Sequence, residues 1–237
     1  MGRTEKKIVQ YLNEAHATET GLVRELQAQI AMTPRGSYRD ALESHLRETR
    51  VHATRVRARL RRLGDGDNAL EAVIGVAESA ISQLLALGRS PLALIRGGSG
   101  EEKVLKNAKD ACATEALEIA TYTAIEDLAR AAGDEDTAEL AVSIRADEQR
   151  MLDRVMREIP NLTAAVLDAE VHGSSSYSIA ETGAADAVRD IADAGKRTAR
   201  KAQGQAGARK AKVQARARSS KGQAGRKART ARKAVRA

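Results

Sequence analysis

The stretch His45-Leu-Arg-Glu-Thr-Arg-Val-His52 carries three side chains that can bind metal ions. Residues three or four positions apart share a helix face, so His45, Glu48 and His52 can point toward one centre. The neighbouring stripe is apolar and includes Leu42 and Val56. An ionised carboxylate on an apolar face usually needs a cation, a hydrogen-bond network or a proton to compensate it. The stretch therefore predicts a helix that buries polar chemistry at a helix–helix interface.

Glutamate interrupts the apolar face of three further segments in the same way. Glu19, Glu115 and Glu148 each lie on an apolar stripe with helical spacing, and Glu118 follows Glu115 by one turn. The four segments predict amphipathic helices over about residues 6–32, 38–63, 101–132 and 136–159. Start signals are predicted at Ser37, at Ser99 with Glu102, and at Asp136 with Glu139.

Composition supports an all-α protein. The chain of 237 residues contains only 2% aromatic residues, no Trp, no Phe and three prolines, and it is rich in good helix formers. The first two helices are joined tightly, as are the last two, whereas residues 65–100 form a long connection with helical character. Two hairpins joined by one long crossover have the order of a ferritin-like four-helix bundle.

The domain organisation follows from these segments. Residues 1–160 are predicted to form the bundle, with the crossover at 65–100. Residues 161–195 are predicted to be a linker with a weak helix over 180–194, and residues 196–237 a basic tail that is disordered alone. The single cysteine, Cys112, excludes an internal disulfide framework.

The glutamates and histidines on the apolar stripes predict a metal site. Iron and manganese take carboxylate and imidazole ligands, and a pair of ions in a bundle uses roughly four carboxylates and two imidazoles. Hairpin geometry brings Glu19 level with Glu48, and Glu115 level with Glu148. The alternative is that each glutamate lies at the edge of its stripe and reaches water, and that each histidine is a hydrogen-bonded core residue.

Several segments resemble the ferritin-like family of YciE/YciF stress proteins, the DUF892 group. The resemblance covers about residues 6–159 and rests on residues 11–19, His45-Leu-Arg-Glu-Thr-Arg-Val-His52, Glu115-Ala-Leu-Glu-Ile-Ala-Thr-Tyr122 and Asp147-Glu148. It implies a ferritin-like bundle, a di-iron site and a homodimer. Glu19, Glu48, Glu115 and Glu148 fall on the expected ligand positions, and His45, His52 and Glu118 are supporting candidates.

Two positions depart from the full di-iron pattern, which has a histidine three residues after the glutamates of the second and fourth helices. Those positions hold Val51 and Met151. His52 lies one residue late but on the same face, and the fourth helix has no imidazole to replace the missing one. An asymmetric or single-metal site is therefore an open alternative to two iron or manganese ions, and the sequence leaves catalytic activity undecided.

The charge of the chain is divided. Residues 196–237 hold 16 Lys and Arg and no Asp or Glu, so the other 24 basic and 32 acidic residues give the rest a net charge of −8. A basic segment without aromatic residues predicts non-specific, salt-dependent binding to DNA or RNA. The alternative is a solubilising tail or one that docks on the acidic body of another copy. The predicted nucleic-acid contacts are Lys196, Arg197, Arg200, Lys201, Arg209, Lys210, Lys212, Arg216, Arg218, Lys221, Arg226, Lys227, Arg229, Arg232, Lys233 and Arg236.

Two functions of different classes fit these features. The first is a stress-type di-iron protein that oxidises Fe(II) and is held near nucleic acid by its tail. The second is a non-enzymatic architectural protein, associated with the nucleoid or with RNA, that uses the bundle as a dimerising scaffold. A third idea is a ribosome- or RNA-associated factor that uses the same tail. The sequence contains no apolar run of 18 residues and no signal peptide, which predicts no membrane partner and a cytoplasmic location, with nucleoid association through the tail.

Overall fold

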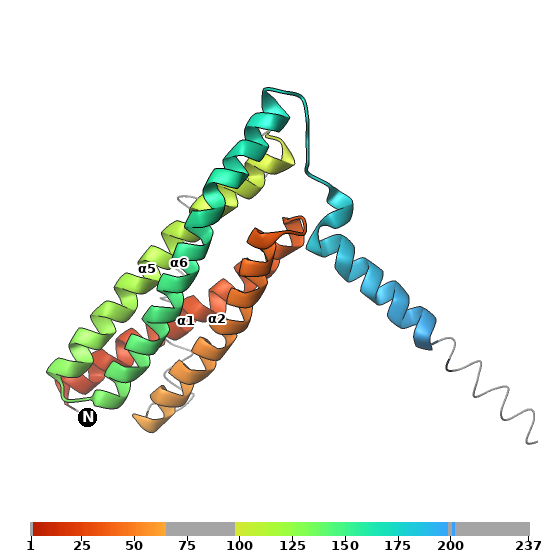
Figure 1. Ribbon diagram of the computed structural model, residues 1–237. Coiled ribbons are helices and arrows are strands. Elements are labelled where there is room, and N and C mark those ends of the chain that lie inside the picture. The colour runs from red at the N-terminus through yellow and green to blue at the C-terminus, as the bar shows by residue number, and fades with distance from the viewer. Residues whose placement is uncertain (1, 65–97, 199–200, 202–237) are drawn as a thin grey trace, which may run out of the picture. The chain divides into compact units, whose positions relative to one another are not determined.

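The computed structural model describes residues 2–64, 98–198 and 201. Within these residues four long helices follow one another: α1 (Arg3–Met32), α2 (Ser37–Arg62), α5 (Gly100–Ala131) and α6 (Glu135–Glu170), with a short 3-10 helix η1 (Ile179–Glu181) after them (Figure 1). The all-α prediction is confirmed, and the predicted helix starts agree to within three residues. The predicted crossover helix over 65–97 and most of the basic tail lie outside the described residues.

The chain divides into two compact units, residues Met1–Asp186 and Ala187–Ala237. The first contains all the named helices. Residues 183–198 are also helical, which is close to the weak helix predicted over 180–194.

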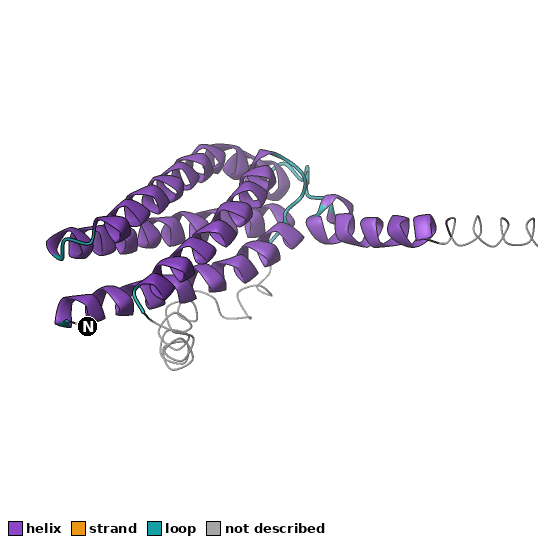
Figure 2. Cartoon of the chain, turned by 90° about the horizontal axis from the view of Figure 1, so that it is seen from below, coloured by secondary structure: helices purple, strands orange, loops and turns teal. Residues whose placement is uncertain are grey.

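The four long helices form a bundle of two hairpins. α1 packs against α2 and α5, and α6 packs against α5 and α2, so each helix has two neighbours (Figures 1 and 2). Glycines with positive φ shape both tight turns: Gly36 (φ 150°) precedes α2, and Gly133 (φ 71°) lies between α5 and α6. A side chain disfavours this backbone conformation, which explains why the two turns contain glycine.

The helix caps confirm one start signal and correct two. Ser99 caps α5 by accepting a hydrogen bond from the Glu102 amide, as predicted. Ser37 is wrong as a cap, because Gly36 occupies that position and the Ser37 hydroxyl donates to Glu158 across the bundle at 2.8 Å. Asp136 is also wrong, because Asp134 caps α6.

The predicted end of the fourth helix at residue 159 is wrong. α6 continues through Pro160 to Glu170. Proline removes one backbone hydrogen bond but does not forbid a helix when packing holds both sides of it. Ile159 and Leu162, on either side of Pro160, pack against the apolar core, and this tertiary contact outweighs the local preference.

The core of the bundle has three layers along its axis. One apolar layer is formed by Ile8, Leu12, Ala15, Val56, Leu60, Tyr122, Ile125, Ala141 and Ile144. The other is formed by Leu26, Tyr38, Ala41, Leu42, Val104, Ala108, Ala111, Met151 and Val155. Between the residues of these two layers in the sequence of the helices lie six buried glutamates and histidines: Glu19, His45, His52, Glu115, Glu118 and Glu148. Buried Glu101, at the start of α5, lies outside this interval. The fold therefore places a polar layer between two apolar layers.

A strap, residues 174–186, packs on the end of the bundle where α1 turns into α2. Oε1 of Glu101, a buried residue of α5, accepts three hydrogen bonds from the strap at 2.7–2.8 Å. The Tyr177 hydroxyl donates to the Met32 carbonyl at 2.9 Å, and Arg39 pairs with Asp186 at 2.7 Å. These contacts fix the chain that follows α6 to the first hairpin.

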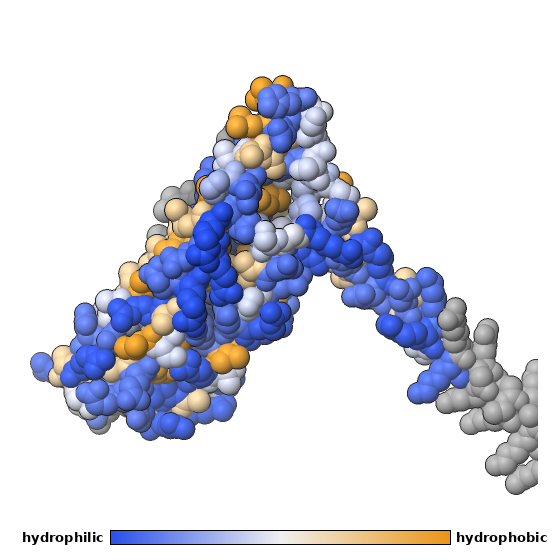
Figure 3. Space-filling view, viewed as in Figure 1, coloured by the Kyte–Doolittle hydropathy of each residue, from blue (hydrophilic) through white to orange (hydrophobic). Residues whose placement is uncertain are grey.

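The surface of the bundle is mostly polar. Figure 3 shows hydrophilic side chains over most of the face in view, with apolar side chains in smaller spots between them. Across the part of the chain that the structure describes, no helix has an apolar stretch that could cross a bilayer.

Candidate metal centre

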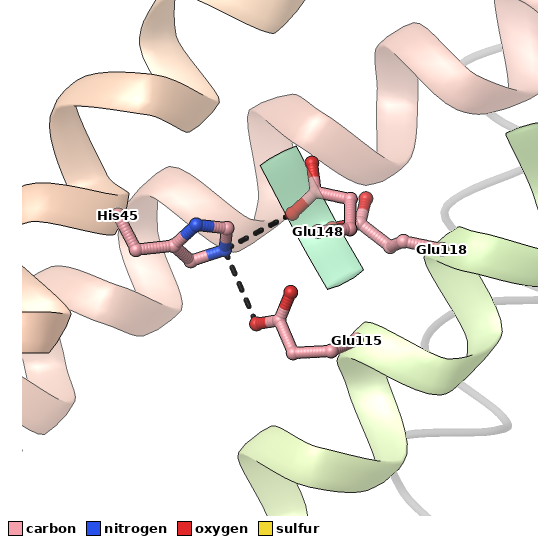
Figure 4. A group of neighbouring side chains, drawn as sticks. All are labelled: His45, Glu115, Glu118 and Glu148. Atoms are coloured by element: carbon pink, nitrogen blue, oxygen red, sulfur yellow. Dashed lines mark ion pairs between the residues drawn. The ribbon is translucent and has the colours of Figure 1, made fainter. Parts of the chain in front are cut away.

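The first group of buried ligands consists of His45, Glu115, Glu118 and Glu148. One ligand atom from each lies within 4.8 Å of the others. Nε2 of His45 lies 3.1 Å from Oε1 of Glu115 and 3.6 Å from Oε2 of Glu148. Figure 4 shows the imidazole pointing toward the carboxylates that α5 and α6 contribute. This group combines three carboxylates and one imidazole in the polar layer.

The second group consists of Glu19, His52 and Glu148, again with ligand atoms within 4.8 Å of one another. Nδ1 of His52 lies 2.8 Å from Oε1 of Glu148 and 3.7 Å from Oε1 of Glu19. Glu148 therefore belongs to both groups, with one oxygen toward each histidine. The two groups adjoin across a single carboxylate.

Helix geometry explains how four elements supply these atoms. His45 and His52 are two turns apart on α2, so both reach the bundle axis at different heights. Glu115 and Glu118 are adjacent on one face of α5. All the residues in the two groups are buried, and Glu19 and Glu148 are 0% exposed.

Two further residues support the centre. The Tyr122 hydroxyl donates to Oε1 of Glu19 at 2.5 Å, and Oδ2 of Asp147 lies 3.1 Å from Nε2 of His52. A carboxylate on the outer ring nitrogen fixes the orientation of a histidine and leaves the other nitrogen to face the ligand site. Sequence reasoning did not assign these roles. The signals were present, since Tyr122 follows Glu118 by one turn and Asp147 precedes Glu148.

Glu48 is the one predicted ligand that the structure does not bring into either group. Its side chain is 30% exposed at the margin of the bundle. Oε2 of Glu48 lies 3.6 Å from Nδ1 of His45 and 3.2 Å from Nη2 of Arg154. Thr49, the next residue, is buried in its place.

Burial sets the protonation of the inner carboxylates. Desolvation, reinforced by the charge of Glu148, raises the pKa of Glu19 to about 8, although His52 opposes this change. Desolvation likewise raises the pKa of Glu115 to about 7, against the lowering effect of His45. The pKa of Glu118 rises well above its usual range through desolvation and the nearby charges of Glu19 and Glu148. Without a cation, the layer holds protons on several carboxylates near neutral pH.

Glu48 and His45, in contrast, are held in their charged forms. Contact with His45 lowers the pKa of Glu48 to about 2, and Arg154 contributes to this change despite partial burial. Desolvation acts to lower the pKa of His45, but contacts with Glu115 and Glu48 outweigh it and raise the pKa to about 10. His45 is therefore held in its protonated form and contributes positive charge to the layer in the metal-free protein.

The polar layer fits a metal ion in two ways: its donor atoms are carboxylate oxygens and imidazole nitrogens, and several of these buried oxygens have no hydrogen-bond partner among the described residues. Buried atoms without a hydrogen-bond partner among the described residues include both oxygens of Glu148 and one oxygen each of Glu19, Glu115 and Glu118. Unpaired buried oxygens are costly, and a cation compensates them. Carboxylate and imidazole donors suit iron, manganese and zinc.

An antiparallel four-helix bundle with buried carboxylates and histidines at its centre defines a ferritin-like protein of the carboxylate–histidine class. The chain belongs to the family described as "Domain of unknown function (DUF892)", whose sequence model matches residues 4–167. The resemblance drawn from the sequence is therefore confirmed.

Solved structures show the same fold. A protein from Xanthomonas campestris pv. campestris matches with a TM-score of 0.56 and 21% identity, covering 71% of this chain and 99% of its own. The E. coli stress protein YciF matches with a TM-score of 0.52 and 20% identity, covering 69% of this chain and 99% of its own. A comparison with curated proteins gave no match.

The predicted nucleic-acid contacts lie mostly beyond the described residues. Lys196, Arg197 and Lys201 are described and exposed. The strap and the basic tail both follow residue 167, where the family match ends.

Proposed function

We propose that this protein is a stress-response protein that binds a pair of iron ions in the polar layer, oxidises Fe(II), and is tethered to nucleic acid by its basic tail. One observation carries the proposal. Six buried ligand-type residues from four helices converge in two groups that share Glu148, and five of their carboxylate oxygens have no hydrogen-bond partner among the described residues. A polar layer that served only stability would be paired internally.

Each residue has a role in this proposal. Glu19, His52 and Glu148 would hold one ion, and His45, Glu115, Glu118 and Glu148 would hold the other. The bound iron would supply the electrons: oxidation of two Fe(II) to two Fe(III) would reduce one hydrogen peroxide, with two protons, to two water molecules.

The protein controls protons and water around this exchange. Glu19, Glu115 and Glu118 hold protons near neutral pH because burial raises the pKa of each. These protons leave when a cation takes their place. Asp147 orients His52, and the apolar layers on both sides restrict access of water.

Metal analysis of a matched pair of variants tests the proposal. Glu148→Gln keeps the shape of the shared ligand but removes its charge, whereas Glu139→Gln makes the same change at an exposed position of α6. Under anaerobic Fe(II), the wild type and Glu139→Gln should each retain about two iron ions per chain. Glu148→Gln should retain fewer than one. A wild-type chain that stays metal-free in excess Fe(II) would refute the proposal.

The second candidate is an architectural nucleic-acid-binding protein with the bundle as a dimerising scaffold. The observation that favours it is the tail, with 16 basic and no acidic residues over 196–237. Protection of plasmid DNA from Fe(II) and peroxide separates the two candidates. The iron protein loses protection in Glu148→Gln while DNA retention is unchanged. An architectural protein protects equally with either glutamate variant.

A further inference from the structure

The seam between α2 and α6 carries two carboxylate–arginine pairs just outside the ligand groups. Glu48 of α2 pairs with Arg154 of α6, and Asp147 pairs with Arg150 one turn earlier on α6. Each carboxylate also faces the outer nitrogen of one buried histidine. The seam is therefore where the polar layer meets the surface.

Exposure distinguishes this seam from the groups behind it. All the residues in the two groups are at most 2% exposed, so an incoming ion has to cross the bundle surface. The side chains of Glu48 and Arg154 are 30% and 31% exposed. Among the described residues the Glu48 carboxylate is thus partly open to solvent, and His45 contacts both Glu48 and the first group.

The contacts of Glu48 are weak enough to exchange. Both of its oxygens share one guanidinium nitrogen of Arg154, at 3.2 and 3.4 Å, and Nδ1 of His45 is 3.6 Å away. Partly exposed ion pairs contribute little net stability, and a divalent cation carries twice the charge of the guanidinium it replaces. Asp147 differs because it lies 3.1 Å from Nε2 of His52, with 20% of its side chain exposed, which assigns it to positioning.

We propose that the α2–α6 seam is the entry port for divalent cations, with Glu48 as the first carboxylate to bind the ion and Arg154 as the competitor that the ion displaces. His45 links the two steps, since its Nδ1 faces Glu48 and its Nε2 faces Glu115 and Glu148. The inference rests on the proposed metal site. It assigns Glu48 to the rate of loading rather than to the final ligand set.

Stopped-flow uptake of Co(II) by the metal-free full-length chain tests the port, with the d–d absorption as the signal. Arg154→Gln should raise the uptake rate constant on the order of 3- to 10-fold, because the competing charge is gone. Glu48→Gln should lower it by about tenfold or more, because the first binding charge is lost. Arg157→Gln, an exposed arginine one turn further along α6, is the control and should leave the rate unchanged.

Final Co(II) content separates failure of the port from failure of the site. All three variants should reach the wild-type number of ions per chain, with unchanged helical circular dichroism of the metal-free protein. Equal uptake rates in all chains would overturn the port while leaving the metal site intact. A lower final content in Glu48→Gln would make Glu48 a resident ligand and also overturn it. A wild type that binds no Co(II) would overturn both.

Discussion

Glu118 illustrates how much the metal-free protein relies on protons at the scale of single residues. Its carboxyl group is buried, has one oxygen without a hydrogen-bond partner among the described residues, and faces the charges of Glu19 and Glu148. A neutral acid is the stable form in such surroundings. The stability of the metal-free bundle therefore depends on keeping protons that a metal ion would expel.

This dependence predicts that the metal-free protein loses stability as the pH rises. The pKa values of Glu19 and Glu115 rise from 4.5 to about 8 and about 7 on folding, and that of His45 rises from 6.5 to about 10. Groups with raised pKa values stabilise the fold fully below their unfolded pKa and lose that contribution as the pH passes the folded value. The free energy of unfolding should fall on the order of a few kcal/mol between about pH 5 and pH 9.

Thermal unfolding with a chelator present, at intervals across this range, measures the effect. Glu48 acts in the opposite sense at low pH, since its pKa falls from 4.5 to about 2 and its contribution is lost as the pH falls through this range. The maximum should therefore lie near pH 5. Glu118→Gln, which mimics the neutral acid, should weaken the pH dependence. A melting temperature that stays level or rises from pH 5 to 9 would contradict the assignment.

The candidate site was largely predictable from sequence because each ligand lies on a buried helical stripe. Glu19, Glu115, Glu118 and Glu148 lie where the stripes place them, as do both histidines of α2. Glu48 was predicted to be a ligand because it follows His45 by three residues on the same stripe. The structure places it at the edge of the buried face of α2, and Thr49 is buried instead. Spacing along a helix does not show where its buried face ends. The roles of Asp147 and Tyr122 depend on contacts between helices, which spacing along one helix does not show.

At the scale of secondary-structure elements, local sequence patterns predicted which segments are helical better than they predicted where each helix ends. The apolar stripes fixed all four long helices, and the glycines marked both tight turns. The end of α6 could not be read locally, since Pro160 is a stop signal that packing of Ile159 and Leu162 overrides. The packing of the strap on the bundle could not be predicted from local sequence signals either, because its hydrogen bonds join residues that are more than 70 positions apart.

The strap predicts a specific effect of substitution at Gly100, the first residue of α5. A Cβ atom at this position would overlap the ring of Tyr177. Gly100→Ala should therefore displace the strap while leaving the bundle folded, and chymotrypsin should cleave after Tyr177 faster than in the wild type. Mass spectrometry of the fragments gives the measurement.

Gly21→Ala is the matched control, because among the described residues no atom beyond the neighbouring backbone of α1 lies within 4 Å of the Cβ it would add. This change should stabilise the helix by about 0.5–1 kcal/mol and leave cleavage after Tyr177 unaltered. Equal cleavage in Gly100→Ala and wild type would show that the strap tolerates the added methyl group.

At the scale of the whole molecule, the chain combines an acidic body with a basic tail. The tail carries 16 positive charges, whereas the remaining residues sum to −8. Removing residues 196–237 should abolish retention on DNA, because the phosphate-binding charge goes with them. The affinity of the full chain should fall about 10³-fold between 50 and 200 mM salt if ~6 phosphates are engaged.

Filter binding across a salt series, with both chains, checks this prediction. Iron uptake and helical circular dichroism of the shortened chain serve as controls, since the ligand groups lie wholly before residue 196. Retention that persists without the tail would place the nucleic-acid contact on the acidic body, against the charge distribution.

The shared carboxylate of Glu148 has a consequence for how the centre fills. One side chain belongs to both groups, so under the proposed function an ion in one group would orient the carboxylate and drive out protons that the other group would otherwise hold. Such coupling between sites would be cooperativity, and it would keep half-loaded chains rare. A solitary Fe(II) can give peroxide only one electron, which produces a hydroxyl radical. If the tail holds DNA as proposed, filling in pairs would therefore limit radical damage to that DNA.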